Sequence, residues 1–208
     1  MKKILLLMTS IMLLGSIYAQ SSKKEDKNRN VLSEFEEMKK NFSESESEWV
    51  FSKIVTAENK SKEDIYNKAL EVLADIYKDS KDVIQNKDKE AGLIVGKGFI
   101  DSDIRTINWA SICRNRCWHL IKIEIKEGKY RISITVNSVW NETGADLRHP
   151  FKGTEYKLSN FYPYWKDCKP KHRITSFDNL KFVYDSSMGI IRNLEEEINK
   201  KLASNDNW

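Results

Sequence analysis

The chain is poor in the residue types that mark several classes of protein. Its 208 residues include only 3 Pro and 8 Gly, too few for a collagen-like or proline-rich chain. No apolar run reaches the roughly 20 residues that a membrane-spanning helix needs, which excludes a multi-span membrane protein. The formal net charge of +4 is too small to imply a nucleic-acid partner by itself.

The chain does contain enough apolar material for a folded domain. Hydrophobic residues make up 40% of it, with 6 Trp, 8 Tyr and 8 Phe among them, and this content excludes a wholly disordered chain. A length of 208 residues allows one domain with extensions, or at most two small domains.

The N-terminal segment has the pattern of a secretory signal peptide. Lys2 and Lys3 precede an apolar run over 4–14, and the small residue Ala19 follows. The run is too short to span a bilayer. We therefore expect that residues 1–19 are cleaved off near Ala19, that the mature protein is periplasmic or secreted, and that no membrane span remains after cleavage.

Residues 20–48 are rich in charged and small polar side chains and predict a solvated linker. Within this stretch four apolar residues recur at helical spacing, namely Leu32, Phe35, Met38 and Phe42. The spacing predicts a short amphipathic helix over 31–42. Such a helix could dock on a partner or membrane surface, or pack loosely on the body, and its mixture of both charge signs favours loose packing.

Residues 49–208 predict a single α+β domain, because the period of the apolar residues alternates between that of a strand and that of a helix. The predicted strands cover 49–56, 82–87, 92–100, 119–126 and 130–137, and the predicted helices cover 62–78 and 177–202. The order β-α-β-β-β-β-α favours a five-stranded antiparallel sheet with two helices packed on one face. Two long connections remain, 101–116 and 141–175, and long connections are often functional.

The most distinctive stretches of this body are Ser61–Tyr66, Asp88–Gly98 and Lys126–Arg131. With their flanking strands they resemble an exported domain-of-unknown-function family of Bacteroidetes that has a TATA-binding-protein-like (TBP-like) fold. The resemblance covers roughly 50–137 and the last helix. It implies the β-α-β4-α fold that the periodicity also predicts, and it implies no established activity.

The three cysteines predict disulfide chemistry, because export exposes a chain to an oxidising environment. Cys168 lies in the second long connection, so a bridge from it to Cys113 or Cys117 would join the two connections. Cys117 continues the alternating apolar face of Ile121 and suits a buried free thiol. We therefore favour Cys113–Cys168, with Cys117–Cys168 as the alternative.

A zinc site is a second interpretation of the same residues. Cys113 and Cys117 are separated by three residues, as are Cys168 and His172, and the four together offer a structural ligand set. Export favours the disulfide, so we predict no metal and no cofactor.

Catalysis has little support in the sequence. The chain has no Gly-x-Ser-x-Gly elbow and no His-Glu-x-x-His motif. The glycines at 92, 96 and 98 lie within a strand pattern, which indicates close packing rather than a phosphate-binding loop. We predict no catalytic residues.

The best binding candidate is the connection 141–175, where aromatic and basic residues are interleaved. The candidate binding residues are Tyr156, Tyr162, Tyr164, Trp165, Lys169 and Arg173, with Arg131 on the open sheet face. The alternative is that the rings fold back onto the sheet as a small apolar cluster.

These patterns together predict a non-catalytic binding or interaction domain of the cell envelope. Its expected partner is an envelope protein or glycan and not a nucleic acid, and its oligomeric state stays open. The alternatives are a structural component of an envelope complex, and a zinc-binding or enzymatic protein that uses the Cys and His residues.

Overall fold

The computed structural model describes residues 31–44, 48–77, 84–102, 105–108, 111–145, 152–158 and 170–204. The signal peptide expected at 1–19 lies outside these ranges. None of the helices within them is both long enough and apolar enough to cross a membrane.

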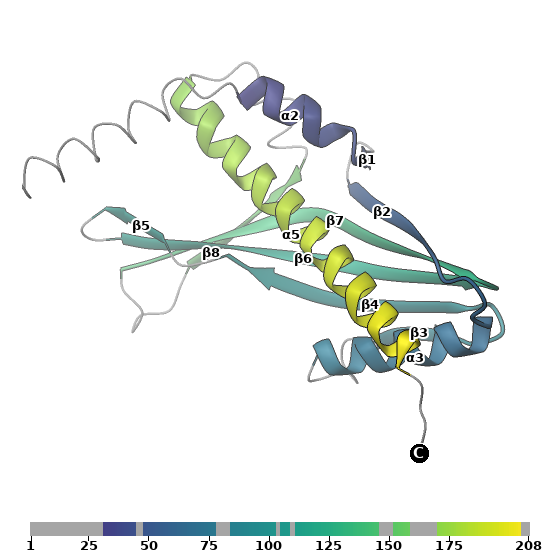
Figure 1. Ribbon diagram of the computed structural model, residues 1–208. Helices are drawn as coiled ribbons and strands as arrows, with labels where there is room; N and C mark the ends of the chain where they lie inside the picture. The colour runs from purple at the N-terminus through teal and green to yellow at the C-terminus, as the bar shows by residue number, and fades with distance from the viewer. Residues whose placement is uncertain are drawn as a thin grey trace, which may run out of the picture.

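The described residues form one antiparallel sheet with helices packed against it (Figure 1). Six of its eight strands follow the order β1-β2-β7-β6-β4-β3, while β5 pairs with β6 and β8 pairs with β7. The strands are β1 (Phe42–Glu44), β2 (Trp49–Thr56), β3 (Ile84–Asp88), β4 (Leu93–Asp101), β5 (Arg105–Asn108), β6 (Ser111–Lys126), β7 (Lys129–Gly144) and β8 (Lys152–Lys157). The helices are α2 (Val31–Lys39), α3 (Lys62–Ile76) and α5 (Pro170–Ala203).

The long β6–β7 hairpin is the centre of the sheet. Glu127 and Gly128 form its turn, and Gly128 has a φ of +68°, which a residue without Cβ adopts at little cost. In the half of the hairpin nearest the turn, called here the near half, alternate residues point inward. They form an aliphatic core with the helices. These residues are Ile121, Ile123, Ile125, Tyr130, Ile132, Ile134 and Val136.

The helices cover one face of the sheet. The Ser61 hydroxyl caps α3 by accepting a hydrogen bond from the Asp64 backbone N–H at 3.0 Å. In α5 one stripe of apolar residues is buried, and the helix continues through Gly189, a residue of low helix propensity. The predicted α3 and the predicted last helix are confirmed, although α5 begins before residue 177.

The short amphipathic helix predicted over 31–42 is present as α2, but the prediction of a solvated linker is wrong for residues 31–44. Helix α2 buries Val31, Phe35 and Met38, and β1 pairs with β2. The rings of Phe42 and Trp49 stack with their centroids 4.5 Å apart. The segment is therefore part of the domain, because an aromatic cluster anchors it despite its charged composition.

The prediction of two long connections is also wrong where the structure describes them. Strand β5 and the first part of β6 lie within 101–116, while the end of β7, strand β8 and the start of α5 lie within 141–175. The α+β class is confirmed, but the sheet has eight strands rather than five, and three helices rather than two belong to the described part. Polar residues at inward positions, Asn115 and His119, interrupt the apolar alternation in the first part of β6.

Candidate functional site

The face of the sheet that the helices do not cover is called here the open face. In an antiparallel pair, residues directly opposite each other project from the same face. Phe99 of β4 pairs with Trp118 of β6, and Lys97 pairs with Leu120. Their sequence neighbours Gly98 and His119 are buried, so these four side chains project from the open face.

We call Lys97, Phe99, Arg116, Trp118 and Leu120 the open-face patch. Phe99 is 49% exposed, and Trp118 and Leu120 are each 40% exposed. The two aromatic rings meet edge to face, with their centroids 5.2 Å apart and their planes at 63°. Such a cluster of large apolar side chains in water favours a binding role over chance exposure.

Two cations lie against these rings. The Lys97 Nζ is 5.1 Å from the centroid of Trp118, and the Arg116 Cζ is 5.0 Å from the centroid of Phe99. Cation–π contacts at exposed sites contribute about 0.5–1 kcal/mol each. The patch therefore combines apolar ring surface with positive charge.

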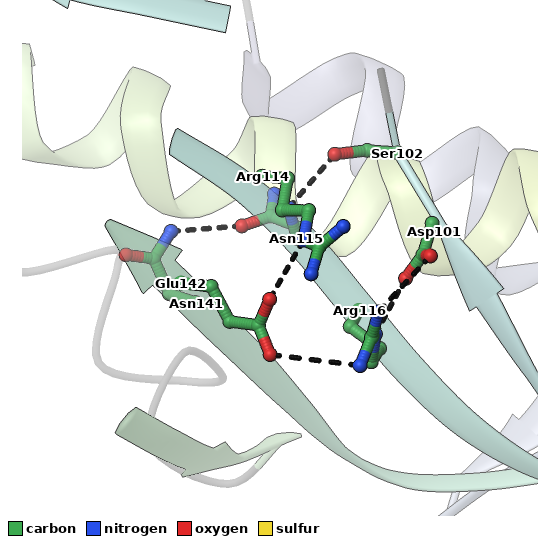
Figure 2. A network of polar contacts seen from close by, with 7 residues as sticks. All are labelled: Asp101, Ser102, Arg114, Asn115, Arg116, Asn141 and Glu142. Carbon is green, nitrogen blue, oxygen red and sulfur yellow. Dashed lines mark hydrogen bonds and ion pairs between the residues drawn. The ribbon is translucent and has the colours of Figure 1, made fainter. Parts of the chain in front are cut away.

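A polar network fixes Arg116 (Figure 2). Its Nε donates to Asp101 Oδ1 at 2.6 Å and its Nη2 donates to Oδ2 at 3.2 Å, while its Nη1 lies 3.7 Å from Glu142. Glu142 also accepts from the Nε of Arg114 at 2.7 Å. The hydrogen bonds to Asp101 raise the pKa of Arg116, so its charge is permanent and already engaged.

A hollow adjoins the patch. Its volume is about 310 Å³, at the lower end of the range for small-ligand sites. It is lined by apolar, aromatic and polar residues, namely Glu48, Lys97, Trp118, His119, Leu120, Thr135 and Asn137.

A buried polar pair lies behind the patch, on the helix side of the sheet. The Nε2 of His119 is 3.1 Å from the Tyr77 hydroxyl. Gly98 makes room for both rings, since a Cβ there would lie 2.9 Å from atoms of each. Burial lowers the pKa of His119 to about 4 and raises the pKa of Tyr77 to about 12, so the pair is neutral at neutral pH.

Asn115 forms a second buried polar group on the helix side. Its Oδ1 accepts from Asn141 of β7, and its Nδ2 donates to Asn179 of α5, both at 2.8 Å. Its backbone exchanges two further hydrogen bonds with Ser102. The side chain is thereby satisfied although it is buried, as a polar group in a core requires.

The structure describes the side chains of two of the predicted binding residues, Tyr156 and Arg131, and these lie on opposite faces of the sheet. Tyr156, 37% exposed, pairs with the buried Val139 and so lies on the helix side at strand β8. Arg131 lies on the open face and forms an ion pair with Glu124 at 3.0 Å. Arg173 is in α5 with its side chain outside the description, and the remaining candidates lie outside the described residues: Tyr162, Tyr164, Trp165 and Lys169.

The structure describes two of the three cysteines in the predicted bridge and its alternative. Cys113 and Cys117 are buried free thiols, and Cys168 lies outside the described residues. The inward position predicted for Cys117 is confirmed, and burial raises the pKa of its thiol to about 12. The Cys113–Cys168 disulfide, and its alternative from Cys117, stay predictions.

The zinc interpretation receives no support from the described residues. Among them no three His, Cys, Asp or Glu side chains lie close enough together to hold a metal ion. The site includes Cys168 and the side chain of His172, neither of which the structure describes.

Sequence reasoning missed the open-face patch, although a signal for it exists. If the alternation of Ile121, Ile123 and Ile125 is extended toward the N-terminus, Cys117 points inward and Trp118 outward. An exposed Trp in a strand then stands out.

Comparison with known proteins identifies the fold. Residues 51–139 match the family model described as a domain of unknown function (DUF4468) with TBP-like fold. A solved DUF4468 family protein from Bacteroides ovatus is 15% identical, with a TM-score of 0.55 over 81% of this chain and 94% of that one. No curated protein matches the chain.

A solved TBP-like protein from Parabacteroides distasonis is 16% identical, with a TM-score of 0.52 over 76% of this chain and 96% of that one. At such identities the likeness establishes the fold and carries no activity. The chain thus has a TBP-like α+β fold, and its residues 51–139 are similar to the DUF4468 family.

Proposed function

We propose that this protein is an exported, non-catalytic binding domain that engages a partner in the cell envelope through the open face of its sheet. The observation that carries this proposal is the open-face patch: two half-exposed aromatic rings in contact, with a cation against each. Aromatic and Arg side chains of this kind are the usual anchors of a binding surface.

The position of the patch supports a binding role. The helices pack on the opposite face, where the apolar core lies. Burying a large aromatic side chain contributes about 1.5–3 kcal/mol to stability. Aromatic residues that served only stability would therefore be expected on the inward face, unlike Phe99 and Trp118. Their place on the open face instead leaves their surface available to a partner.

The buried ionisable groups support a non-catalytic role. A general base works best with a pKa near the operating pH. His119, with its pKa lowered to about 4, and Cys117, with its pKa raised to about 12, both depart from that range. Desolvation is the main cause in both cases, which is the behaviour of core residues.

The cellular location rests on the N-terminal pattern. Lys2 and Lys3, the short apolar run and Ala19 support export by a signal peptide covering 1–19. Detection of a mature chain that begins near Gln20 in a periplasmic or medium fraction is the expected result.

Binding can be tested with envelope polysaccharides and envelope protein extract immobilised on separate columns. Trp118→Ala and Phe99→Ala should each weaken retention at least tenfold. Ile54→Ala is the matched control, because Ile54 is 65% exposed on the same face but lies on β2 beside Arg131. Full retention by both aromatic variants, with melting temperatures unchanged, would contradict an open-face site.

The connection 141–175, called here the aromatic connection, stays a second candidate binding surface of the same domain. Tyr164→Ala and Trp165→Ala test it in the same assay. Unchanged binding in both would remove this segment from the site and leave the open face alone.

A role in assembly is a second candidate function, favoured by the exposure of Ile54. In the described part of the chain, β2 pairs with β1 only over Trp49–Phe51, and β2 extends five residues further, to Thr56. An unpaired strand edge can pair with another chain. Light scattering at high concentration tests this: a monomer in both the parent chain and Ile54→Lys would count against assembly through β2.

A further inference from the structure

Within the proposed function, we infer that the hollow beside the open-face patch binds an acidic sugar unit of a polysaccharide. The inference rests on the open face being a binding surface and adds the chemical class of the ligand. Three properties of the hollow carry it: an aromatic wall, a polar rim and a cation that has no anionic partner among the described residues.

The aromatic wall is the indole of Trp118. A pyranose ring has one face of C–H groups, and placing that face on an aromatic ring buries apolar surface from both partners. Phe99 continues this surface next to Trp118, with the ring centroids 5.2 Å apart. A polymer could therefore contact one ring with one sugar unit and the second ring with its neighbour.

The polar rim matches sugar hydroxyls. Thr135 provides a hydroxyl, Asn137 provides an amide that both donates and accepts, and Glu48 provides carboxylate acceptors. A mixture of donors and acceptors beside an aromatic wall suits a polyol better than an apolar peptide side chain. The volume of about 310 Å³ also suits a small unit rather than a protein segment.

Lys97 supplies the argument for an acidic unit. Within the described part of the chain, the contact recorded for Lys97 is with the Trp118 ring, and it has no ion pair. Three other cations on this face have carboxylate partners, Arg116 with Asp101 and both Lys122 and Arg131 with Glu124. Glu48, the one acid in the lining, already has an interaction of its own.

Lys97 thus offers a ligand in the hollow a positive charge that is not paired with a carboxylate of the described residues. Its Nζ lies 5.1 Å from the centroid of the ring on which the sugar would stack. A carboxylate or sulfate on the stacked unit would form the ion pair that Lys97 does not make with any described residue. Charge complementarity thus selects an acidic sugar over a neutral one.

Titration calorimetry of the full secreted chain tests the inference with two acidic polymers, polygalacturonate and alginate, and two neutral ones, dextran and mannan. We expect at least one acidic polymer to bind at least tenfold more tightly than either neutral polymer. Its affinity should fall with added salt, since a charge contact is screened.

Four variants and one control separate the contributions of the Trp118 ring and the Lys97 charge to the affinity. Trp118→Ala should abolish binding, and Trp118→Phe should keep part of it. Lys97→Gln should lower the affinity for the acidic polymer about tenfold and weaken its salt dependence, whereas Lys97→Arg should retain both. Ile54→Ala should bind as the parent does, and a thermal melt of each variant confirms that it is folded.

The outcomes separate this inference from the function on which it rests. Equal binding of neutral and acidic polymers, or no effect of Lys97→Gln, would overturn the acidic sugar and keep the open-face site. Retention of an envelope protein that Trp118→Ala removes, with no polymer bound, would replace the sugar with a protein. Absence of any ligand sensitive to Trp118→Ala would overturn both.

Discussion

The two halves of the β6–β7 hairpin are built on different principles although they are parts of the same two strands. Near the turn, the inward positions of β6 hold Ile121, Ile123 and Ile125. Beyond the register shift at Cys117/His119, they hold His119, Cys117 and Asn115. The near half is held by apolar burial and the far half by a small number of hydrogen bonds, and Arg116 and Trp118 of the open-face patch project from the reverse of the far half.

This difference affects how each half responds to change. Apolar packing is distributed over many contacts and tolerates exchange between similar side chains. A buried polar network depends on every member, because an unsatisfied group in a core costs about 1–3 kcal/mol. The far half is therefore a precise but sensitive support for the surface that carries Trp118.

The largest expected effect is a loss of core packing in the near half. Ile123→Ala removes a side chain with no exposed surface, and such a truncation costs about 2–5 kcal/mol through lost burial and the cavity left behind. Urea denaturation measures it. Cys117→Ala, a smaller truncation in the far half, is the matched comparison. An equal loss in both would contradict the division of the hairpin into two kinds of core.

The second effect is a dependence of stability on pH that belongs to the far half. The pKa of His119 is about 4 in the folded protein and 6.5 ordinarily, so the unfolded state binds the proton more readily. Its stabilising effect is complete above pH 6.5 and is lost as the pH falls toward 4, to a total of about 3 kcal/mol.

His119→Gln provides the comparison, because it lacks the titrating ring while the carboxylates of the chain stay the same. The difference in unfolding free energy between parent and variant should shrink as the pH falls from 6.5 to 4. A constant difference across this range would show that His119 keeps its ordinary pKa in the folded protein.

The third effect is the loss of the asparagine network. Asn115→Ala leaves Asn141 and Asn179 without their partner, and we expect a cost of about 1–3 kcal/mol. A double-mutant cycle with Asn179→Ala isolates the contact between β6 and α5. Additive losses in that cycle would mean that the 2.8 Å hydrogen bond adds nothing to stability.

The smallest effect on stability is expected at the open-face patch. Trp118→Ala should lower the unfolding free energy by about 1 kcal/mol or less, because the side chain is 40% exposed and its cation–π contact is weak. Thermal unfolding checks this value. A loss comparable to that of Ile123→Ala would indicate that Trp118 serves the fold rather than a partner.

The same division explains how much of the structure the sequence predicts. The near half of the hairpin and helix α3 follow from strict periodicity and from the Ser61 cap, and both are confirmed. The far half could not be predicted because Asn115 and His119 take inward positions that alternation assigns to apolar residues. Their burial depends on Asn179 and Tyr77, distant in sequence.

The candidate site was missed for the same reason. Trp118 is outward by the same alternation that places Cys117 inward, but His119, a polar residue at an inward position, interrupts the apolar pattern between Cys117 and Ile121. The aromatic connection attracted attention because its composition is unusual, but the one ring of its candidate set that the structure describes, Tyr156, lies on the helix side. Composition indicates which residues are present, whereas strand register determines which of them share a surface.

The space that Gly98 leaves for two rings restricts which side chains relatives of this protein can carry at these positions. A Cβ at this position would approach His119 and Tyr77 to 2.9 Å, so the three positions share one fixed volume. Relatives that carry Ala or Ser at the position of Gly98 should carry a smaller side chain at the position of one of the two rings. Such covariation would show that the same packing lies behind the patch in relatives whose sequences are too divergent to align by identity.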